Sequence, residues 1–99
     1  MALIVSPEAE EQIAEIDAWW RRNRPASPTL FVDELAAALD LILVMPKAGR
    51  RYRLPGEPGP RRLLLRNTRY HIYYLVSAAD TYVLAVWSAV RGEGPELKT

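Results

Sequence analysis

The chain has 99 residues, 49 % of them apolar and 25 % charged, and a formal net charge of +1. This length suits one domain with one core, and the composition excludes a disordered or low-complexity chain. No apolar run approaches the roughly 20 residues that a membrane helix needs. The first five residues are too short and uncharged for a signal peptide. We therefore expect a single domain over residues 1–99 that is cytoplasmic and does not enter a membrane.

The chain also lacks the residues of common metal sites. It has no cysteine and only one histidine, which excludes disulfide scaffolds, thiolate metal sites and multi-histidine metal sites. We expect no cofactor and no bound metal.

The first half predicts a short strand and a helix. Residues 2–5 are apolar and favour a strand. Ser6 and Pro7 then form a helix start, with serine as the N-cap and proline at the first helical position. The helix should run to about Arg22, because one face of it carries an apolar stripe at helical spacing, formed by Ala9, Ile13, Ile16 and Trp20.

A second helix follows, and Ser27 with Pro28 repeats the same start signal. Its C-terminal turn is apolar nearly all round, which predicts burial in this core or against another chain. Pro46 and Gly49 end the helix. The short turn between the helices predicts an antiparallel hairpin. Its apolar stripe is formed by Phe31, Leu35, Ala38, Ile42 and Met45.

The second half has the period of strands. Turn residues separate four predicted strands, which cover residues 50–54, 61–66, 70–77 and 81–90. The expected fold class is α+β, with the element order β-α-α-β-β-β-β. An N-terminal helical hairpin should pack on one face of a mainly antiparallel sheet.

Alternation along the last two strands predicts which side chains share a face. Both faces are rich in apolar or aromatic residues, and two helices can cover only one of them. The other face should be a partner surface. In the third predicted strand, Tyr70, Ile72, Tyr74 and Val76 oppose His71, Tyr73 and Leu75, and in the last, Tyr82, Leu84, Val86 and Ser88 oppose Val83, Ala85, Trp87 and Ala89.

The small net charge hides an asymmetry. Residues 8–40 carry eight acids and three arginines, a net charge of −5, whereas residues 50–69 carry seven arginines and one acid, a net charge of +6. Arginine favours planar, bidentate contacts with carboxylate or phosphate, so an anionic partner is one explanation. Two others are a codon bias toward arginine and charges that protect edge strands from pairing.

Together these features resemble the RelE/ParE superfamily of bacterial type II toxins, the ParE branch most closely. Each motif is weak alone, but their order and spacing across the chain are fairly specific. The matching residues are Ser6-Pro7-Glu8-Ala9, Trp19-Trp20, Phe31, Leu35, Pro46, Gly49-Arg50, Arg61-Arg62, Arg66, Tyr70-His71-Ile72-Tyr73-Tyr74 and Val86-Trp87-Ser88-Ala89-Val90-Arg91-Gly92.

The resemblance implies a toxin that a cognate ParD-like antitoxin keeps silent, with operator DNA contacted only indirectly through the antitoxin. The ParE branch is similar to poisons of DNA gyrase that act by binding. The RelE branch comprises ribosome-dependent mRNA endonucleases, which usually supply a terminal tyrosine or histidine. Residues 92–99 have neither, and Ser88 stands where many relatives have histidine. This favours a gyrase poison over a nuclease.

We therefore expect no catalytic residue. If the chain were a nuclease, its candidates would be Arg62, Arg66, Tyr70 and Arg91, with His71 as a possible proton-transfer group. The residues expected to bind the antitoxin or the target are Arg50, Arg51, Arg53, Arg61, Arg62, Arg66, Arg69, Tyr73, Trp87 and Arg91.

Overall fold

The computed structural model describes residues 2–52, 59–90, 94–95 and 97. The observed element order is the predicted one. The elements are β1 (Ala2–Val5), α1 (Pro7–Asn23), α2 (Leu30–Val44), β2 (Arg50–Arg51), β3 (Arg61–Leu65), β4 (Tyr70–Val76) and β5 (Asp80–Ser88).

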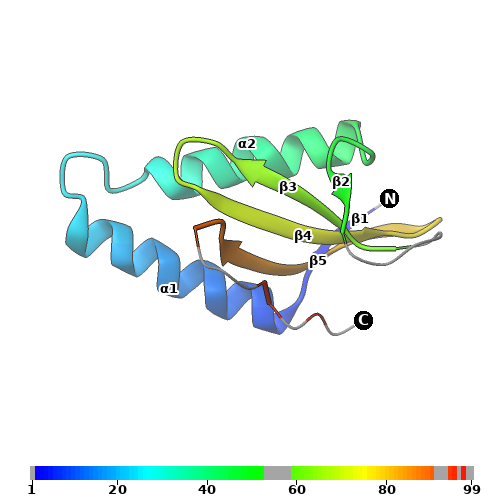
Figure 1. The fold of residues 1–99 in the computed structure, drawn as a ribbon, viewed down its shortest axis with the longest axis horizontal. Coiled ribbons are helices and arrows are strands. Elements are labelled where there is room, and N and C mark those ends of the chain that lie inside the picture. Colours follow the sequence, from blue (N-terminus) through cyan, green and yellow to red (C-terminus); the bar gives the residue numbers. More distant parts are fainter. Residues whose placement is uncertain (1, 53–58, 91–93, 96, 98–99) are drawn as a thin grey trace.

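The five strands form one sheet in the order β1-β5-β4-β3-β2. Only β1 pairs in parallel, with β5, and the other neighbours are antiparallel. The helices run antiparallel to each other along the sheet (Figure 1). The predicted α+β class is thus confirmed. Within the described residues, no helix is long and apolar enough to cross a membrane.

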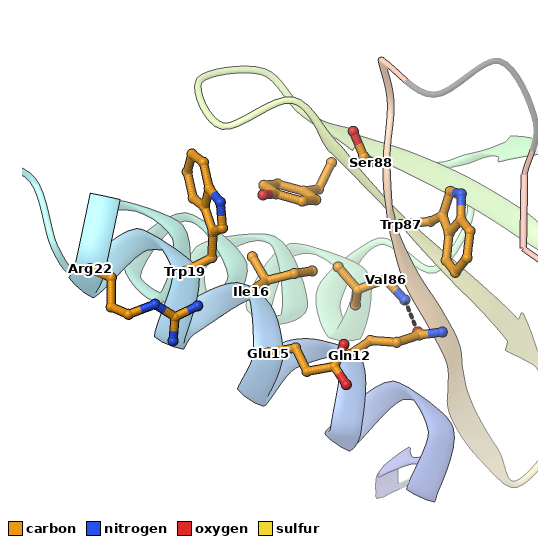
Figure 2. Close-up of a pocket in the computed structure, with 9 residues that line it drawn as sticks. Gln12, Glu15, Ile16, Trp19, Arg22, Val86, Trp87 and Ser88 are labelled. Atoms are coloured by element: carbon orange, nitrogen blue, oxygen red, sulfur yellow. Dashed lines mark hydrogen bonds between the residues drawn. The ribbon is translucent and has the colours of Figure 1, made fainter. Parts of the chain in front are cut away.

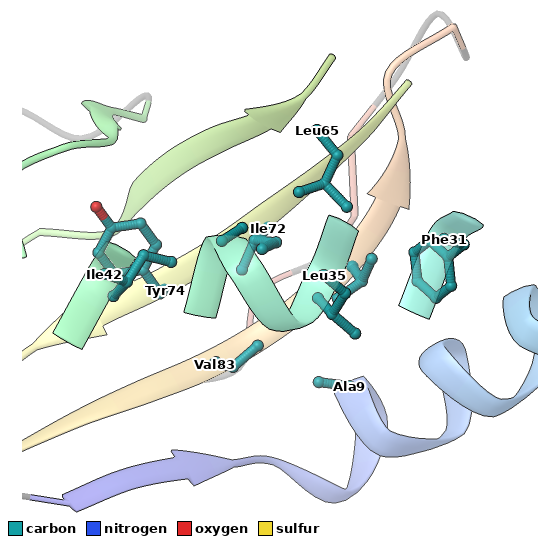
Figure 3. Packing of buried hydrophobic residues seen from close by; sticks show 10 residues of the cluster. Ala9, Phe31, Leu35, Ile42, Leu65, Ile72, Tyr74 and Val83 are labelled. Carbon is teal, nitrogen blue, oxygen red and sulfur yellow. The ribbon is translucent and has the colours of Figure 1, made fainter. Parts of the chain in front are cut away.

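The main core lies between the helices and one face of the sheet (Figure 3). Phe31, Leu35 and Ile42 of α2 pack against Ile72 and other strand residues. Because these stripe positions recur at helical spacing, α2 turns one continuous apolar face toward the sheet. The helices therefore leave the opposite sheet face, the open face, free of helical cover.

A β-bulge interrupts the alternation predicted for β5, so part of that prediction is wrong. The register shifts between Tyr73 and Tyr74, which pair with Ala85 and Val83, so Leu84 is an extra residue. Val83 and Val86 consequently both belong to the core beneath the helices, although strict alternation predicts opposite faces. The bulge depends on pairing with β4, which the sequence of β5 alone does not show.

The two helix starts also differ, although their sequence signals look alike. Ser6 caps α1 as predicted, since its Oγ accepts a hydrogen bond from the Ala9 N–H at 3.1 Å. α2 instead begins at Leu30 with Thr29 as N-cap and no side-chain capping bond. The Ser27 N–H and C=O are engaged in turns with Arg24 and Leu30. The prediction of a Ser27 cap is therefore wrong.

At the C-terminal turn of α2, only Ile42 is buried in this chain's core, and the other apolar side chains are exposed. Val44 is 80 % exposed and Met45 57 % exposed, so burial within this core, one of the two predicted options, is wrong.

A buried tyrosine fixes the loop after α2. The Tyr74 hydroxyl donates to the Pro46 C=O at 2.7 Å and accepts from the Gly49 N–H at 2.8 Å. A Cβ on residue 49 would lie 2.6 Å from this oxygen and 2.9 Å from the Arg62 carbonyl oxygen. Glycine is therefore needed here so that the chain can approach closely and enter β2.

Candidate functional site

The open face carries a small aromatic cluster. Tyr52, Tyr73 and Ala85 are buried there, and Trp87 packs against them. The rings of Tyr52 and Tyr73 meet edge to face, with centroids 4.8 Å apart. Tyr73 and Trp87, two of the expected binding residues, therefore lie on one face, as alternation predicts.

Arginines face each other in pairs across β2 and β3. Arg50 lies opposite Arg62, and Arg51 lies opposite Arg61. Like charges placed directly opposite each other in a sheet are destabilising. The cost falls on Arg50 and Arg62, which are both exposed, whereas the Arg61 guanidinium donates a hydrogen bond to the Gly49 C=O at 2.9 Å. An anionic partner would relieve the repulsion between Arg50 and Arg62.

Arg62 belongs to one of the arginine pairs and also contacts the aromatic cluster. It lies opposite Tyr73 in the β3–β4 register, and its guanidinium carbon is 5.2 Å from the centroid of the Tyr52 ring. Burial raises the pKa of Tyr73, although hydrogen bonding and charge from Arg62 oppose this rise. Tyr73 is therefore neutral at physiological pH.

His71 lies on the same face, with its ring centroid 6.0 Å from that of Tyr73. Burial lowers the pKa of His71, and the positive charge of Arg62 lowers it further. His71 is therefore mostly neutral at pH 7, because its ordinary value is 6.5.

Residues near the C-terminus lie against this cluster. Leu97 packs on it, and Pro95 is buried. A Cβ on Gly94 would clash with the Tyr52 hydroxyl oxygen, so the backbone passes directly against this side chain. The sequence indicates only a break in structure here, and the contact depends on tertiary packing.

Two further arginines lie away from the opposed pairs, in the turn between β3 and β4. Arg66 and Arg69 are both exposed there, and Arg69 has a positive φ of 67°. Glu34 of α2 holds this turn through hydrogen bonds from Asn67 and Thr68. The other two expected arginines, Arg53 and Arg91, lie outside the described residues.

The structure separates the described candidates for a nuclease site. Tyr70 lies on the helix-covered face, where its hydroxyl oxygen accepts a hydrogen bond from the Trp20 Nε1–H at 3.2 Å. Arg62 lies on the open face and Arg66 lies in the turn. These three side chains do not converge on one point. Among the described residues, no group of three His, Cys, Asp or Glu side chains could hold a metal ion.

A groove of about 490 Å³ lies between α1 and the end of β5 (Figure 2). Gln12 crosses its floor, where the side-chain Oε1 accepts a hydrogen bond from the Val86 N–H at 2.8 Å. Trp19 stands on the α1 side and Trp87 on the strand side. The lining residues are Gln12, Glu15, Ile16, Trp19, Arg22, Tyr70, Val86, Trp87 and Ser88.

Sequence reasoning missed Gln12 and Glu34. Each contacts a backbone more than 30 residues away in the chain, so neither contact has a local signal. The one hint for Gln12 is that it is the uncharged member of the run Glu10-Glu11-Gln12.

Comparisons with known proteins agree with this architecture. The model of a family described as the ParE toxin of the type II toxin–antitoxin system parDE matches residues 3–91. A solved structure described as the chromosomal ParDE TA system from P. aeruginosa is similar in fold, with a TM-score of 0.71. It is 19 % identical, and the match covers 89 % of this chain and 95 % of that chain. No curated protein matches the chain.

Proposed function

Since the chain belongs to the ParE toxin family of parDE type II toxin–antitoxin systems, we propose that it inhibits DNA gyrase in the cytoplasm by binding, without catalysis. A ParD-type antitoxin neutralises it and alone contacts operator DNA. One observation carries this proposal: Arg50 and Arg62 face each other beside an aromatic cluster on the open face.

The opposed arginines suit an anionic partner. DNA held by gyrase carries phosphates, and guanidinium groups bind phosphate in bidentate fashion. A phosphate between the Arg50 and Arg62 guanidinium groups would turn the repulsion between them into attraction. We assign the target- or antitoxin-binding role to the residues expected from the sequence, namely Arg50, Arg51, Arg53, Arg61, Arg62, Arg66, Arg69, Tyr73, Trp87 and Arg91.

The position of Tyr70 supports binding over RNA cleavage. General acid–base catalysis needs proton-transfer groups within hydrogen-bond reach of the reacting atoms. Tyr70 lies on the sheet face opposite Arg62, so these two groups cannot act together on one phosphate.

Gyrase-dependent cleavage of supercoiled plasmid by purified, antitoxin-free toxin tests the proposal. We expect linear DNA to accumulate only when gyrase is present. Arg50→Gln should lose this effect, whereas Arg21→Gln should retain it, because Arg21 pairs with Asp17 on α1, away from the open face. Untouched plasmid, together with continued growth arrest, would contradict gyrase as the target.

One observation favours a second candidate, the ribosome-dependent mRNA endonuclease. His71 is mostly neutral and lies beside Arg62, so a base and a phosphate-binding cation share the open face. This candidate requires mRNA cleavage on translating ribosomes that disappears in His71→Ala. Toxicity that survives His71→Ala would exclude it.

A further inference from the structure

The opposition of Arg50 and Arg62 depends on a very short strand. β2 consists of Arg50 and Arg51 alone, which pair with Arg62 and Arg61 of β3. A strand of two residues is shorter than is usual, and it forms too few ladder hydrogen bonds to set its own register. Other contacts must therefore hold Arg50 opposite Arg62.

The residue before Arg50 is held by both of its backbone groups. The Gly49 N–H donates to the Tyr74 hydroxyl oxygen at 2.8 Å, and the Gly49 C=O accepts from the Arg61 guanidinium at 2.9 Å. The Tyr74 hydroxyl donates in turn to the Pro46 C=O at 2.7 Å. One tyrosine hydroxyl thus closes the loop between the end of α2 and the start of β2.

Tyr74 is a rigid anchor because its ring is fully buried. The residue is 0 % exposed and belongs to the main core together with Ile42 of α2 (Figure 3). Arg61 lies directly opposite it in the register of β3 and β4. Burial raises the pKa of Tyr74, although the hydrogen bond from Gly49 and the charge of Arg61 oppose this rise. The hydroxyl therefore keeps its proton at physiological pH, and it can donate and accept at the same time.

The chain is also held close against β3 at both ends of β2. A Cβ on Gly49 would lie 2.6 Å from the Tyr74 hydroxyl oxygen and 2.9 Å from the Arg62 C=O, so the backbone ahead of β2 fits closely between this side chain and β3. After β2, the Tyr52 N–H donates to the Pro60 C=O at 2.9 Å. These contacts prevent β2 from sliding along β3.

We propose that Tyr74 is a positioning residue for phosphate binding, because it holds Arg50 opposite Arg62 so that both guanidinium groups can contact one phosphate. Their mutual repulsion favours a β2 that turns away from β3, and the Tyr74 hydroxyl opposes this movement. An arginine pair that is already ordered loses less conformational entropy when the anion binds. The inference rests on the proposed phosphate-binding role of the two arginines, and it adds a residue that contacts no phosphate itself.

A double-mutant cycle separates positioning from general stability. Binding of a short fluorescein-labelled DNA duplex is measured without gyrase for the wild type, Tyr74→Phe, Arg50→Gln and the double variant. We expect Tyr74→Phe to weaken binding about three- to fivefold in the wild-type background, but less than about 1.5-fold in the Arg50→Gln background. Equal losses in the two backgrounds would overturn the proposal.

The salt dependence of the same binding gives a second readout. Each phosphate contact contributes about 0.9 to the slope of log affinity against log salt concentration. Tyr74→Phe should reduce this slope toward that of Arg50→Gln, because an arginine that has moved out of the pair neutralises no phosphate. A slope equal to that of the wild type would contradict positioning.

Ser6→Ala is the matched control for lost stability. Like Tyr74→Phe, it removes one hydroxyl that makes two hydrogen bonds, here with the Ala9 N–H and the Leu84 C=O. Ser6 lies beside β1 and β5, at the opposite edge of the sheet from β2. The Ser6→Ala variant should therefore bind the duplex as the wild type does. A loss of binding as large as that of Tyr74→Phe would show that binding follows overall stability.

Amide hydrogen exchange of the wild-type toxin provides a test that does not require Tyr74→Phe to fold. The Gly49 amide should exchange slowly in the free toxin, and saturating duplex should change its rate by no more than about twofold. Protection that appears only when the duplex is bound would show that DNA, rather than Tyr74, orders the loop. That result would overturn the proposal.

The outcomes also distinguish this inference from the proposed function. Duplex binding that couples Arg50 to Tyr74, without gyrase-dependent cleavage, would reject gyrase as the target and retain the positioning role. Gyrase-dependent cleavage with uncoupled duplex binding would retain the target and reject the positioning role. Duplex binding that does not depend on Arg50 would also reject the positioning role.

Discussion

Glu34 of α2 is hydrogen-bonded to Thr68 in the turn between β3 and β4. The carboxylate accepts hydrogen bonds from the Thr68 hydroxyl at 2.6 Å and the Thr68 N–H at 2.9 Å, and a third from the Asn67 N–H at 2.8 Å. One side chain thus ties the second helix to the turn that carries Arg66 and Arg69.

Glu34→Gln should destabilise the protein by about 1 kcal/mol, because charge-assisted bonds become neutral ones in a partly exposed site. Urea unfolding measures the loss. Asp33→Asn is the control, since its carboxylate bonds only to the nearby Thr29 hydroxyl. Equal losses in the two variants would contradict a special role for Glu34.

The same carboxylate predicts a pH dependence. Burial raises the pKa of Glu34, but the hydrogen bonds from Thr68 and Asn67 outweigh it and lower the pKa below its ordinary value of 4.5. A lowered folded-state pKa contributes stability above the ordinary value, and that stability is lost as the pH falls through the folded-state pKa. The stability difference between wild type and Glu34→Gln should therefore be constant near neutral pH and shrink in acid. Unfolding measured at a series of pH values tests this prediction. A stability difference between the two proteins that stays constant into acid would contradict it.

Tyr74→Phe should destabilise the protein by about 1 to 3 kcal/mol. It removes the buried bonds to Pro46 and Gly49 and leaves the Gly49 N–H without its partner. Chemical denaturation measures the loss. Tyr82→Phe provides the comparison, because Tyr82 is only half-buried and, among the described residues, its hydroxyl makes no hydrogen bond to the loop. A loss no greater than that of Tyr82→Phe would show that the hydroxyl does not hold the loop.

The two Ser-Pro signals should respond differently to mutation. Ser6→Ala removes the α1 cap and the bond to Leu84, so it should cost about 1 to 2 kcal/mol. Ser27→Ala should change stability by less than about 0.5 kcal/mol, because Ser27 is exposed and does not cap α2. Thermal unfolding of both variants tests the difference, and similar shifts in Tm would refute it.

Arg50→Gln should separate stability from toxicity. Removal of one of two opposed charges should leave the free energy of unfolding unchanged or raise it by about 0.2 to 1 kcal/mol. The same change should abolish gyrase-dependent DNA cleavage under the proposed function. Urea unfolding and the plasmid assay, run on one preparation, measure both effects. A variant that unfolds more easily and stays fully toxic would contradict the assigned role.

The sequence by itself determined the order and type of the elements and the start of α1. These depend on signals that act over a few residues: the Ser6 cap, the stripe that begins at Ala9, and the alternation along β4. The motifs from Tyr70 to Gly92 also pointed to the family, which the match over residues 3–91 confirmed.

Only the tertiary structure decided which side chains meet. The bulge at Leu84 brought Val83 and Val86 to one face, and strand pairing set Arg50 against Arg62 while placing Tyr70 on the other side of the sheet. Gln12 reaches Val86 across 74 positions of the chain. The physical reason is that packing between distant segments sets the strand register and decides which side chains come into contact. Local sequence propensity does not specify which distant residue a given side chain will contact.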